Sequence, residues 1–155
     1  RVHMDNTITP KTNNYVLLDL QTNAYGGAVI QMASLGAKLE GPSADILSVS
    51  DGTALVAGTK GYAWGYTSDL ITSAGITSRG PTYGALVQSK LTGLCTLDAL
   101  NCGFGTANTF QEIFNTSDLA IEGGRAELSI GAAVDGATPA GIYSDVLTFV
   151  ATGTF

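Results

Sequence analysis

Glycine is the residue type that most constrains how this chain folds. The sequence holds 20 glycines among 155 residues, and Asp, Asn, Ser and Pro cluster around many of them. Glycine weakens helices because its backbone loses the most conformational freedom on ordering, and such clusters are typical of turns. The chain is thereby divided into short apolar segments, which favours many short strands over long helices.

The segments between these turns have the lengths and residue types of β-strands. Apolar or alternating runs occupy residues 15–23, 26–34, 44–50, 53–58, 61–69, 82–91, 126–134 and 142–155. Asp51-Gly52 between two of the runs is a strong hairpin signal. About eight to ten short strands separated by turns predict an all-β fold, an antiparallel β-sandwich of Ig-like or jelly-roll topology.

Helix signals are weak. Residues 68–76 and 106–115 have patterns that indicate one or two helical turns each. In the second segment, Thr109 and Glu112 have the spacing of a capping box. No repeat, linker or change of composition divides residues 10–155, so we expect them to form a single domain.

The charge pattern excludes several classes of partner. Charged residues make up 13% of the chain, the net charge is −6, and the seven basic residues are spread singly from Arg1 to Arg125. Nucleic acids and anionic membrane surfaces are bound through clusters of basic residues, so neither is expected as a partner. No apolar run approaches the roughly 18 residues that a membrane-spanning helix needs, so we expect no membrane insertion.

Catalytic and cofactor-binding motifs are missing from the sequence. The only histidine is His3, so a Ser-His-Asp or Cys-His arrangement lacks its base within the rest of the chain. No G-x-S-x-G, P-loop, H-E-x-x-H or dinucleotide fingerprint occurs. A pair of distant carboxylates for glycoside hydrolysis stays an alternative, but Asp51 and Asp135 each precede Gly and are interpreted as turn formers. We therefore expect neither an enzyme nor a bound cofactor or metal ion.

Two cysteines, Cys95 and Cys102, are separated by six residues. This spacing suits a small disulfide-closed loop, which would stabilise the fold by roughly 2.5 kcal/mol if it is unstrained. The alternative is two buried free thiols, since a metal site needs more ligands than these two. A disulfide predicts an oxidising compartment outside the cytoplasm.

The segment KGYAWGY places Tyr62, Trp64 and Tyr66 on one face of a strand. Three rings at this spacing either stack on sugars, if they are exposed, or pack a core, where aromatic side chains bury large areas. We favour the core and keep a glycan-binding face as the alternative.

Asn115-Thr116-Ser117 forms a sequon of the N-x-[ST] type. Glycosylation of Asn115 is therefore a candidate modification in a suitable host. Such triplets also arise often by chance.

The first nine residues alternate as a strand with one apolar face made by Val2, Met4 and Ile8. A polar stretch, residues 10–14, follows as a hinge. One interpretation is that residues 1–9 form the first strand of the subunit's own fold. A second is an end that is disordered in solution. The third, which we favour, is a donor strand that completes a sheet of a neighbouring copy, its alternate side chains filling pockets.

The C-terminal stretch ATPAGIYSDVLTFVATGTF, residues 137–155, is the most distinctive. Its alternation predicts a strand with Leu147, Phe149 and Ala151 on one face. This ending resembles the closing strand of secreted microbial β-sandwich surface proteins, of spore-coat-U-type chaperone–usher pilins and of WxL-type wall-associated domains. The resemblance implies structural subunits and adhesins rather than enzymes.

These observations predict an extracellular structural subunit of a pilus-like cell-surface filament, a head-to-tail homopolymer assembled by donor-strand complementation. Since the chain begins at Arg1, we expect a mature product from which a signal peptide has been removed. The alternatives are a secreted carbohydrate- or surface-binding adhesin domain and a shell-forming capsid or surface-layer protein.

Overall fold

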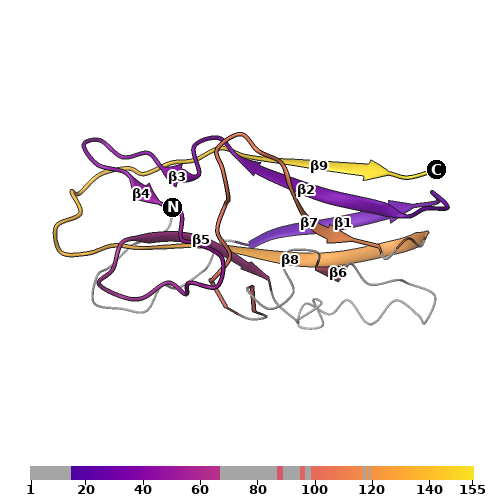
Figure 1. Ribbon diagram of the computed structural model, residues 1–155, viewed down its shortest axis with the longest axis horizontal. Coiled ribbons are helices and arrows are strands. Elements are labelled where there is room, and N and C mark those ends of the chain that lie inside the picture. Colours follow the sequence, from indigo (N-terminus) through magenta and orange to yellow (C-terminus); the bar gives the residue numbers. More distant parts are fainter. Residues whose placement is uncertain (1–14, 67–86, 89–94, 97–98, 117, 119) are drawn as a thin grey trace.

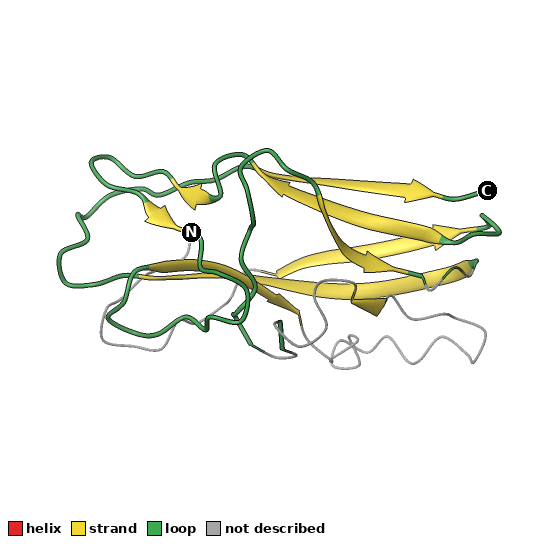
Figure 2. Cartoon of the chain, viewed as in Figure 1, coloured by secondary structure: helices red, strands yellow, loops and turns green. Residues whose placement is uncertain are grey.

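The computed structural model describes residues 15–66, 87–88, 95–96, 99–116, 118 and 120–155. This part of the chain is all-β and contains no helix (Figure 2). Its strands are β1 (Tyr15–Thr22), β2 (Ala28–Ser34), β3 (Lys38–Leu39), β4 (Ile46–Leu47), β5 (Gly61–Tyr66), β6 (Val87–Gln88), β7 (Gln111–Asn115), β8 (Ile121–Ala133) and β9 (Leu147–Gly153). The predicted all-β class is confirmed.

The strands form two larger sheets and one small one. One sheet has the order β1-β8-β5, the second has the order β6-β7-β2-β9, and β3 pairs with β4. All of these pairings are antiparallel. The long strands β2, β8 and β9 run along the long axis of the molecule in Figure 1. Strands adjacent in sequence are therefore mostly assigned to different sheets.

The core draws buried side chains from both larger sheets. Met32 of β2 and Ile113 of β7 come from the four-stranded sheet, while Trp64 of β5 and Leu128 of β8 come from the three-stranded one. All four are fully buried and belong to one apolar cluster, which Phe104 joins from the connection before β7. Burial of apolar surface on this scale is the main stabilising contribution to such a fold.

Several predicted strands lie where the alternation placed them. The runs 15–23 and 26–34 become β1 and β2, although these two strands do not pair with each other. The run 126–134 is the second part of β8, which already begins at Ile121. Sequence alternation therefore located the strands better than it located their partners or their ends.

The predicted helix over residues 106–115 is wrong. Residues 111–115 form β7, which lies between β6 and β2, and Thr109 N donates a hydrogen bond to Thr106 O in the turn before it. Glu112 accepts a bond from Asn115 Nδ2 instead of capping a helix. Two sheet partners supplied from elsewhere in the chain outweigh the weak local helix preference here.

The predicted hairpin around Asp51-Gly52 forms only its turn. Thr53 N donates to Ser50 O at 3.0 Å, and Gly52 has a φ of 85°. The chain beyond the turn does not return along residues 44–50, because Leu55 N donates to Leu100 O instead. The Asp135 turn, in contrast, forms as predicted, with the Asp135 carboxylate accepting bonds from Ala137 N and the Thr138 hydroxyl.

The N-terminal strand, residues 1–9, and the predicted helix over residues 68–76 lie outside the described residues. Of the predicted strand 82–91, residues 87–88 are described and form β6. Within the part of the chain that the structure covers, no helix is long and apolar enough to cross a membrane.

Candidate assembly surface

Two edge strands of the larger sheets, β9 and β1, bear on how this molecule could pair with another chain. Strand β9 lies at the edge of the four-stranded sheet, and β1 lies at the edge of the three-stranded sheet. Within the described part of the chain, β9 pairs only with β2 and β1 pairs only with β8. An edge strand presents unpaired N–H and C=O groups that accept another strand.

Strand β9 has the features of an edge that is open to pairing. It is ladder-paired to β2 without a register shift from Ala28 opposite Gly153 to Ser34 opposite Leu147. Its sequence, LTFVATG, contains no charged residue and no proline. Charges, prolines and bulges are among the devices by which proteins block such edges, and β9 has none of these three.

The two faces of β9 differ as the alternation predicted. Leu147 and Phe149 are half-buried and pack against the core, while Thr148 and Val150 are exposed. Ala151, predicted to share the inner face, is exposed. The inner face is therefore apolar and only partly covered toward its C-terminal end.

The start of β9 is fixed by a partly buried cluster of the polar side chains of Ser34, Tyr62 and Asp145. The carboxylate of Asp145 accepts hydrogen bonds from the Ser34 hydroxyl at 2.6 Å and from the Tyr62 hydroxyl at 3.3 Å. Burial, together with the adjacent Asp145 carboxylate, raises the pKa of the Tyr62 hydroxyl well above its ordinary value. Tyr62 therefore stays protonated and keeps donating to Asp145. Sequence analysis missed this cluster, because Ser34 and Asp145 are remote in the chain.

The end of β9 is fixed by backbone hydrogen bonds to the connection between β1 and β2. Gly26 N donates to Thr154 O at 2.9 Å, and Thr154 N donates to Gly27 O at 2.9 Å. Gly27 has a φ of 73°, a conformation that glycine adopts without strain. Both ends of β9 are thus anchored to the four-stranded sheet and its neighbouring turn.

Strand β1 combines an apolar inner face with a mixed outer face. Val16, Leu18 and Leu20 are half-buried and pack against the core, whereas Leu17 and Asp19 are exposed. The ladder to β8 runs from Tyr15 opposite Ser129 to Thr22 opposite Ile121, with a register shift between Leu20 and Thr22. Strand β1 therefore covers the core at one edge of the three-stranded sheet. No described strand pairs with its other side.

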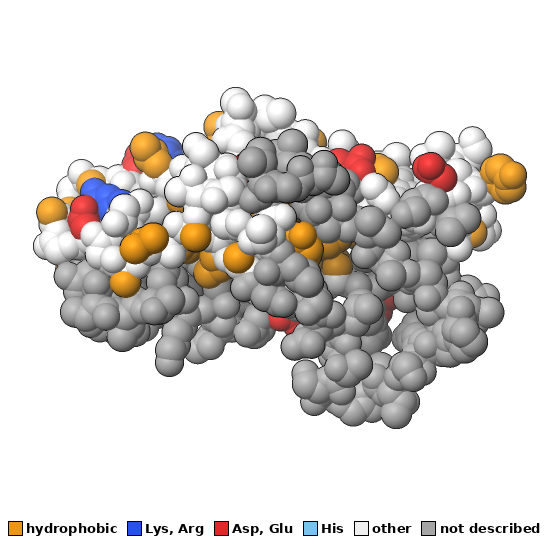
Figure 3. All heavy atoms as spheres, turned by 60° about the horizontal axis from the view of Figure 1, so that its bottom comes forward, with side chains coloured by type: hydrophobic (Ala, Val, Ile, Leu, Met, Phe, Trp, Pro, Cys, Tyr) orange, Lys and Arg blue, Asp and Glu red, His pale blue; other side chains and the backbone are white. Residues whose placement is uncertain are grey.

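Charged residues are few in this chain, at 13% of the sequence. Over the described part of the face in Figure 3, apolar side chains lie among polar ones, with acidic and basic groups at scattered places. The large apolar side chains that are exposed are Leu17, Tyr25, Leu35, Leu47, Val56, Phe110, Ile142, Val146, Val150 and Phe155. Val150 belongs to β9 and Val146 is the residue before it, so part of this exposed apolar surface lies along this edge strand.

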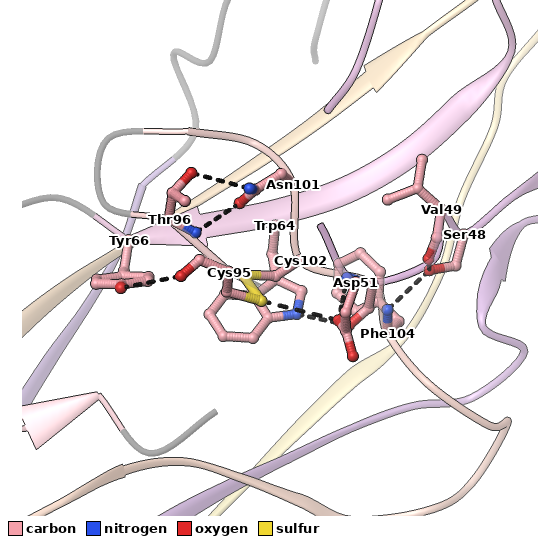
Figure 4. The surroundings of a disulfide bond; sticks show 11 residues. Ser48, Val49, Asp51, Trp64, Tyr66, Cys95, Thr96, Asn101, Cys102 and Phe104 are labelled. Atoms are coloured by element: carbon pink, nitrogen blue, oxygen red, sulfur yellow. Dashed lines mark hydrogen bonds between the residues drawn. A yellow bond between two sulfur atoms is a disulfide. The ribbon is translucent and has the colours of Figure 1, made fainter. Parts of the chain in front are cut away.

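The predicted disulfide between Cys95 and Cys102 is present, and their Cα atoms are 5.2 Å apart. Both cysteines are buried, and Cys102 pairs through its backbone with Trp64 of β5 (Figure 4). Trp64 Nε1 donates to Gly103 O at 2.8 Å, and the Asp51 carboxylate accepts from Gly103 N at 2.8 Å. The disulfide therefore fixes Cys102, whose backbone pairs with β5 on the side that β8 does not occupy.

The aromatic row of β5 belongs largely to the core. Tyr62 and Trp64 are 3% and 0% exposed, so neither ring offers a surface on which a sugar could stack. Tyr62 stacks on Phe104 with ring centroids 4.2 Å apart, and the half-buried Tyr66 meets Phe114 edge to face. The burial of these rings supports the interpretation that they pack the core.

Asn115, the first residue of the sequon, lies in a sheet rather than in a loop. Asn115 is the last residue of β7 and is half-buried, with Val29 opposite it on one side and Val87 on the other. Thr116 is buried, and its hydroxyl accepts a hydrogen bond from Ala28 N at 2.9 Å. Glycosylation of Asn115 stays a prediction.

Val2, Met4 and Ile8, the side chains predicted to form a donor strand, lie outside the described residues. In the part of the chain that is described, no three His, Cys, Asp or Glu side chains gather closely enough to hold a metal ion. Comparisons of the chain with protein-family models, with curated proteins and with solved structures gave no match.

Proposed function

We propose that this protein is a structural subunit of an extracellular, pilus-like filament whose copies are joined by β-strand addition. The single observation that carries this proposal is the edge strand β9, which has an unpaired outer side among the described residues and no charge, proline or bulge to protect it. A strand of this kind pairs readily with an extended segment of another chain.

The extended segment that we assign to this role is the predicted donor strand, residues 1–9, with Val2, Met4 and Ile8 as the side chains that enter pockets. Strand addition gains affinity from main-chain hydrogen bonds and specificity from alternate side chains. Because donor and acceptor lie at different places on the same chain, the contact is head-to-tail and generates a fibre unless its rotation closes a ring.

The fold that supports this role is, in our proposal, a β-sandwich of the two larger sheets. One apolar cluster contains Met32 of the four-stranded sheet and Trp64 and Leu128 of the three-stranded sheet, which supports face-to-face packing. The strand orders β6-β7-β2 and β5-β8 match the D-E-B and C-F strands of an Ig-type sandwich. The first and last strands, β1 and β9, have then exchanged the edges that they occupy in that topology.

An extracellular location is supported by the disulfide between Cys95 and Cys102, because disulfides persist in oxidising compartments.

Electron microscopy of the purified native protein tests the filament proposal. We expect regular fibres from the full chain and none after deletion of residues 1–9. Val2→Asp or Met4→Asp should impair fibre formation much more than His3→Asp, because only the even positions enter pockets. Monomers alone would contradict the proposal, and closed shells or flat sheets would favour the capsid or surface-layer alternative. Equal effects of the even and odd substitutions would contradict the donor role of residues 1–9.

A further inference from the structure

Two Asp-Gly pairs in this chain hold a reactive combination of groups. They are Asp51-Gly52 and Asp135-Gly136, and the sequence contains no other Asp-Gly and no Asn-Gly pair. The backbone nitrogen that follows an aspartate can attack the side-chain carboxyl group and close a succinimide ring. Glycine hinders this attack least, because it has no Cβ and the widest backbone freedom. The sequence makes both pairs candidates, and the fold decides which of them can react.

Asp51-Gly52 is held in a form that does not close the ring. The Asp51 carboxylate accepts a hydrogen bond from Gly103 N at 2.8 Å, and Gly52 N donates to Asn101 O at 2.8 Å. Asn101 is buried, and it lies next to Cys102 of the disulfide. The carboxyl group and the attacking nitrogen are therefore each bound to the segment at the disulfide instead of meeting each other.

Asp135-Gly136 is held in the opposite way. The Asp135 carboxylate accepts hydrogen bonds from Ala137 N at 3.1 Å and from the Thr138 hydroxyl at 2.6 Å. The first of these bonds closes an Asx turn, which folds the carboxyl group back over the peptide bond between Asp135 and Gly136. Gly136 is exposed, and its N–H has no hydrogen-bond partner among the described residues. The two reacting groups are thus brought together, which lowers the entropy cost of the ring closure.

We propose that Asp135 is a site of spontaneous modification, at which the folded protein forms isoaspartate while Asp51 stays intact. Gly136 N attacks Cγ of the acid form of Asp135, a C–N bond forms, and the carboxyl hydroxyl leaves with the amide proton as water. Water then adds to the main-chain carbonyl carbon of Asp135 and breaks its bond to Gly136 N. The chain now runs through the Asp135 side chain, and the former main-chain carbonyl carbon carries the free carboxylate.

The modified residue no longer supports the turn that follows β8. Isoaspartate adds a carbon to the backbone and removes the carboxylate oxygen that Ala137 N and the Thr138 hydroxyl bind. The hydrogen bond from the Thr138 hydroxyl, more than any other contact, holds the pKa of the Asp135 carboxyl below its ordinary value. The carboxyl group is therefore mostly ionised at neutral pH. Since the acid form is the one that cyclises readily, the change accumulates slowly.

Peptide mapping of the aged protein tests this assignment. The full chain is incubated at neutral pH, either folded or unfolded in guanidinium chloride with its disulfide reduced, and is then digested after Lys and Arg. Asp51 falls in the peptide 39–60 and Asp135 in the peptide 126–155. Electron-transfer fragmentation locates isoaspartate within each peptide. We expect similar amounts at both positions in the unfolded chain, and isoaspartate at Asp135 alone in the folded protein.

Three variants sharpen the comparison. Asp135→Asn and Asp51→Asn undergo the same ring closure faster, with ammonia as the leaving group, and only Asp135→Asn should deamidate while folded. The amide oxygen of Asp51→Asn still accepts the bond from Gly103 N, so this variant keeps the contact that holds the group away. Gly136→Ala places a Cβ beside the attacking nitrogen and should slow the change at Asp135. Gly136 does not have a positive φ, so alanine fits its backbone.

The outcomes are distinct from those of the filament experiments. Equal amounts of isoaspartate at Asp51 and Asp135 in the folded protein would overturn the inference. A folded protein in which Asp135 stays intact for as long as the unfolded chain needs to react would overturn it as well. Neither result bears on the filament function, because the reaction takes place within one chain.

Discussion

The two edge strands β1 and β9 look alike in sequence but are held in different ways. Each alternates apolar and polar residues, and each pairs with one strand in the described part of the chain. Strand β9 is fixed at its start by the Asp145 carboxylate and at its end by the backbone of Thr154. Strand β1 is held by its ladder to β8, by three half-buried side chains and, at its end, by a hydrogen bond from Ala24 N to Thr22 Oγ1. The comparison teaches that edge strands with the same kind of ladder can differ in their anchors: the carboxylate at the start of β9 joins it to β2 and β5, whereas the bond at the end of β1 joins it to the turn that follows.

The largest expected effect separates the two faces of β1. Leu18→Asp places a charge against the core and should lower the free energy of unfolding by about 3 kcal/mol and abolish fibres. Leu17→Asp, one residue earlier on the exposed face, should cost no more than about 1 kcal/mol, including its repulsion from Glu127 directly opposite. Chemical denaturation and electron microscopy of both variants make the comparison. Equal losses would mean that β1 does not cover the core as described.

A smaller effect is expected at the anchor of β9. Asp145→Ala removes the acceptor for the Ser34 and Tyr62 hydroxyls, which should cost about 1–3 kcal/mol. Hydrogen exchange should accelerate at the start of β9 and stay unchanged in β1. Glu40→Ala is the control, because this exposed carboxylate lies nearby and its backbone pairs with Ser144 regardless of the side chain. Faster exchange in β1 would show that the two edges are not held independently.

The same anchor predicts a dependence of stability on alkaline pH. The raised pKa of Tyr62 means that the unfolded chain loses this proton at a lower pH than the folded chain does. The contribution of Tyr62 is therefore fully present below about pH 10 and declines above it, by up to about 1.4 kcal/mol per pH unit. Stability curves from pH 8 to 11 should fall less steeply for Tyr62→Phe than for the native protein. Parallel curves would contradict the buried, protonated hydroxyl.

The smallest expected effect on stability concerns the open edge itself. Val150 is exposed on β9, so Val150→Lys should change the free energy of unfolding by no more than about 0.5 kcal/mol. A lysine on an edge strand discourages pairing with another chain, so we expect fewer or shorter fibres by electron microscopy. Val56→Lys, also exposed but outside any strand, is the control. Unchanged assembly of Val150→Lys would exclude β9 as the acceptor edge.

Much of the strand content could be predicted from the sequence, because alternation and turn residues are local signals. The inner positions of Leu147 and Phe149 follow from alternation alone. The strand over residues 111–115 could not be predicted, because its conformation depends on β2, which lies far away in the chain. Nothing local indicates that β1 pairs with β8 rather than with β2.

The candidate site was predictable only in part, for the same reason. The spacing of the cysteines predicted their disulfide correctly. The spacing of Tyr62 and Trp64 put them on one face but could not decide their burial. The burial of these rings depends on a segment around Ala99 that packs closely against β5. The approach is so close that a Cβ at Gly65 would collide with the carbonyl of Ala99.

The sequence separation of the paired strands sets the order in which the subunit can fold. Tyr15 pairs with Ser129, and Ala28 pairs with Gly153, so neither large sheet is complete until nearly the whole chain has been made. Such non-local pairing folds slowly. While β8 waits for β1, its edge and the apolar positions that β1 will cover stay exposed to other chains, a condition that favours association. The protein concentration during folding should therefore set how much of the material folds alone and how much associates.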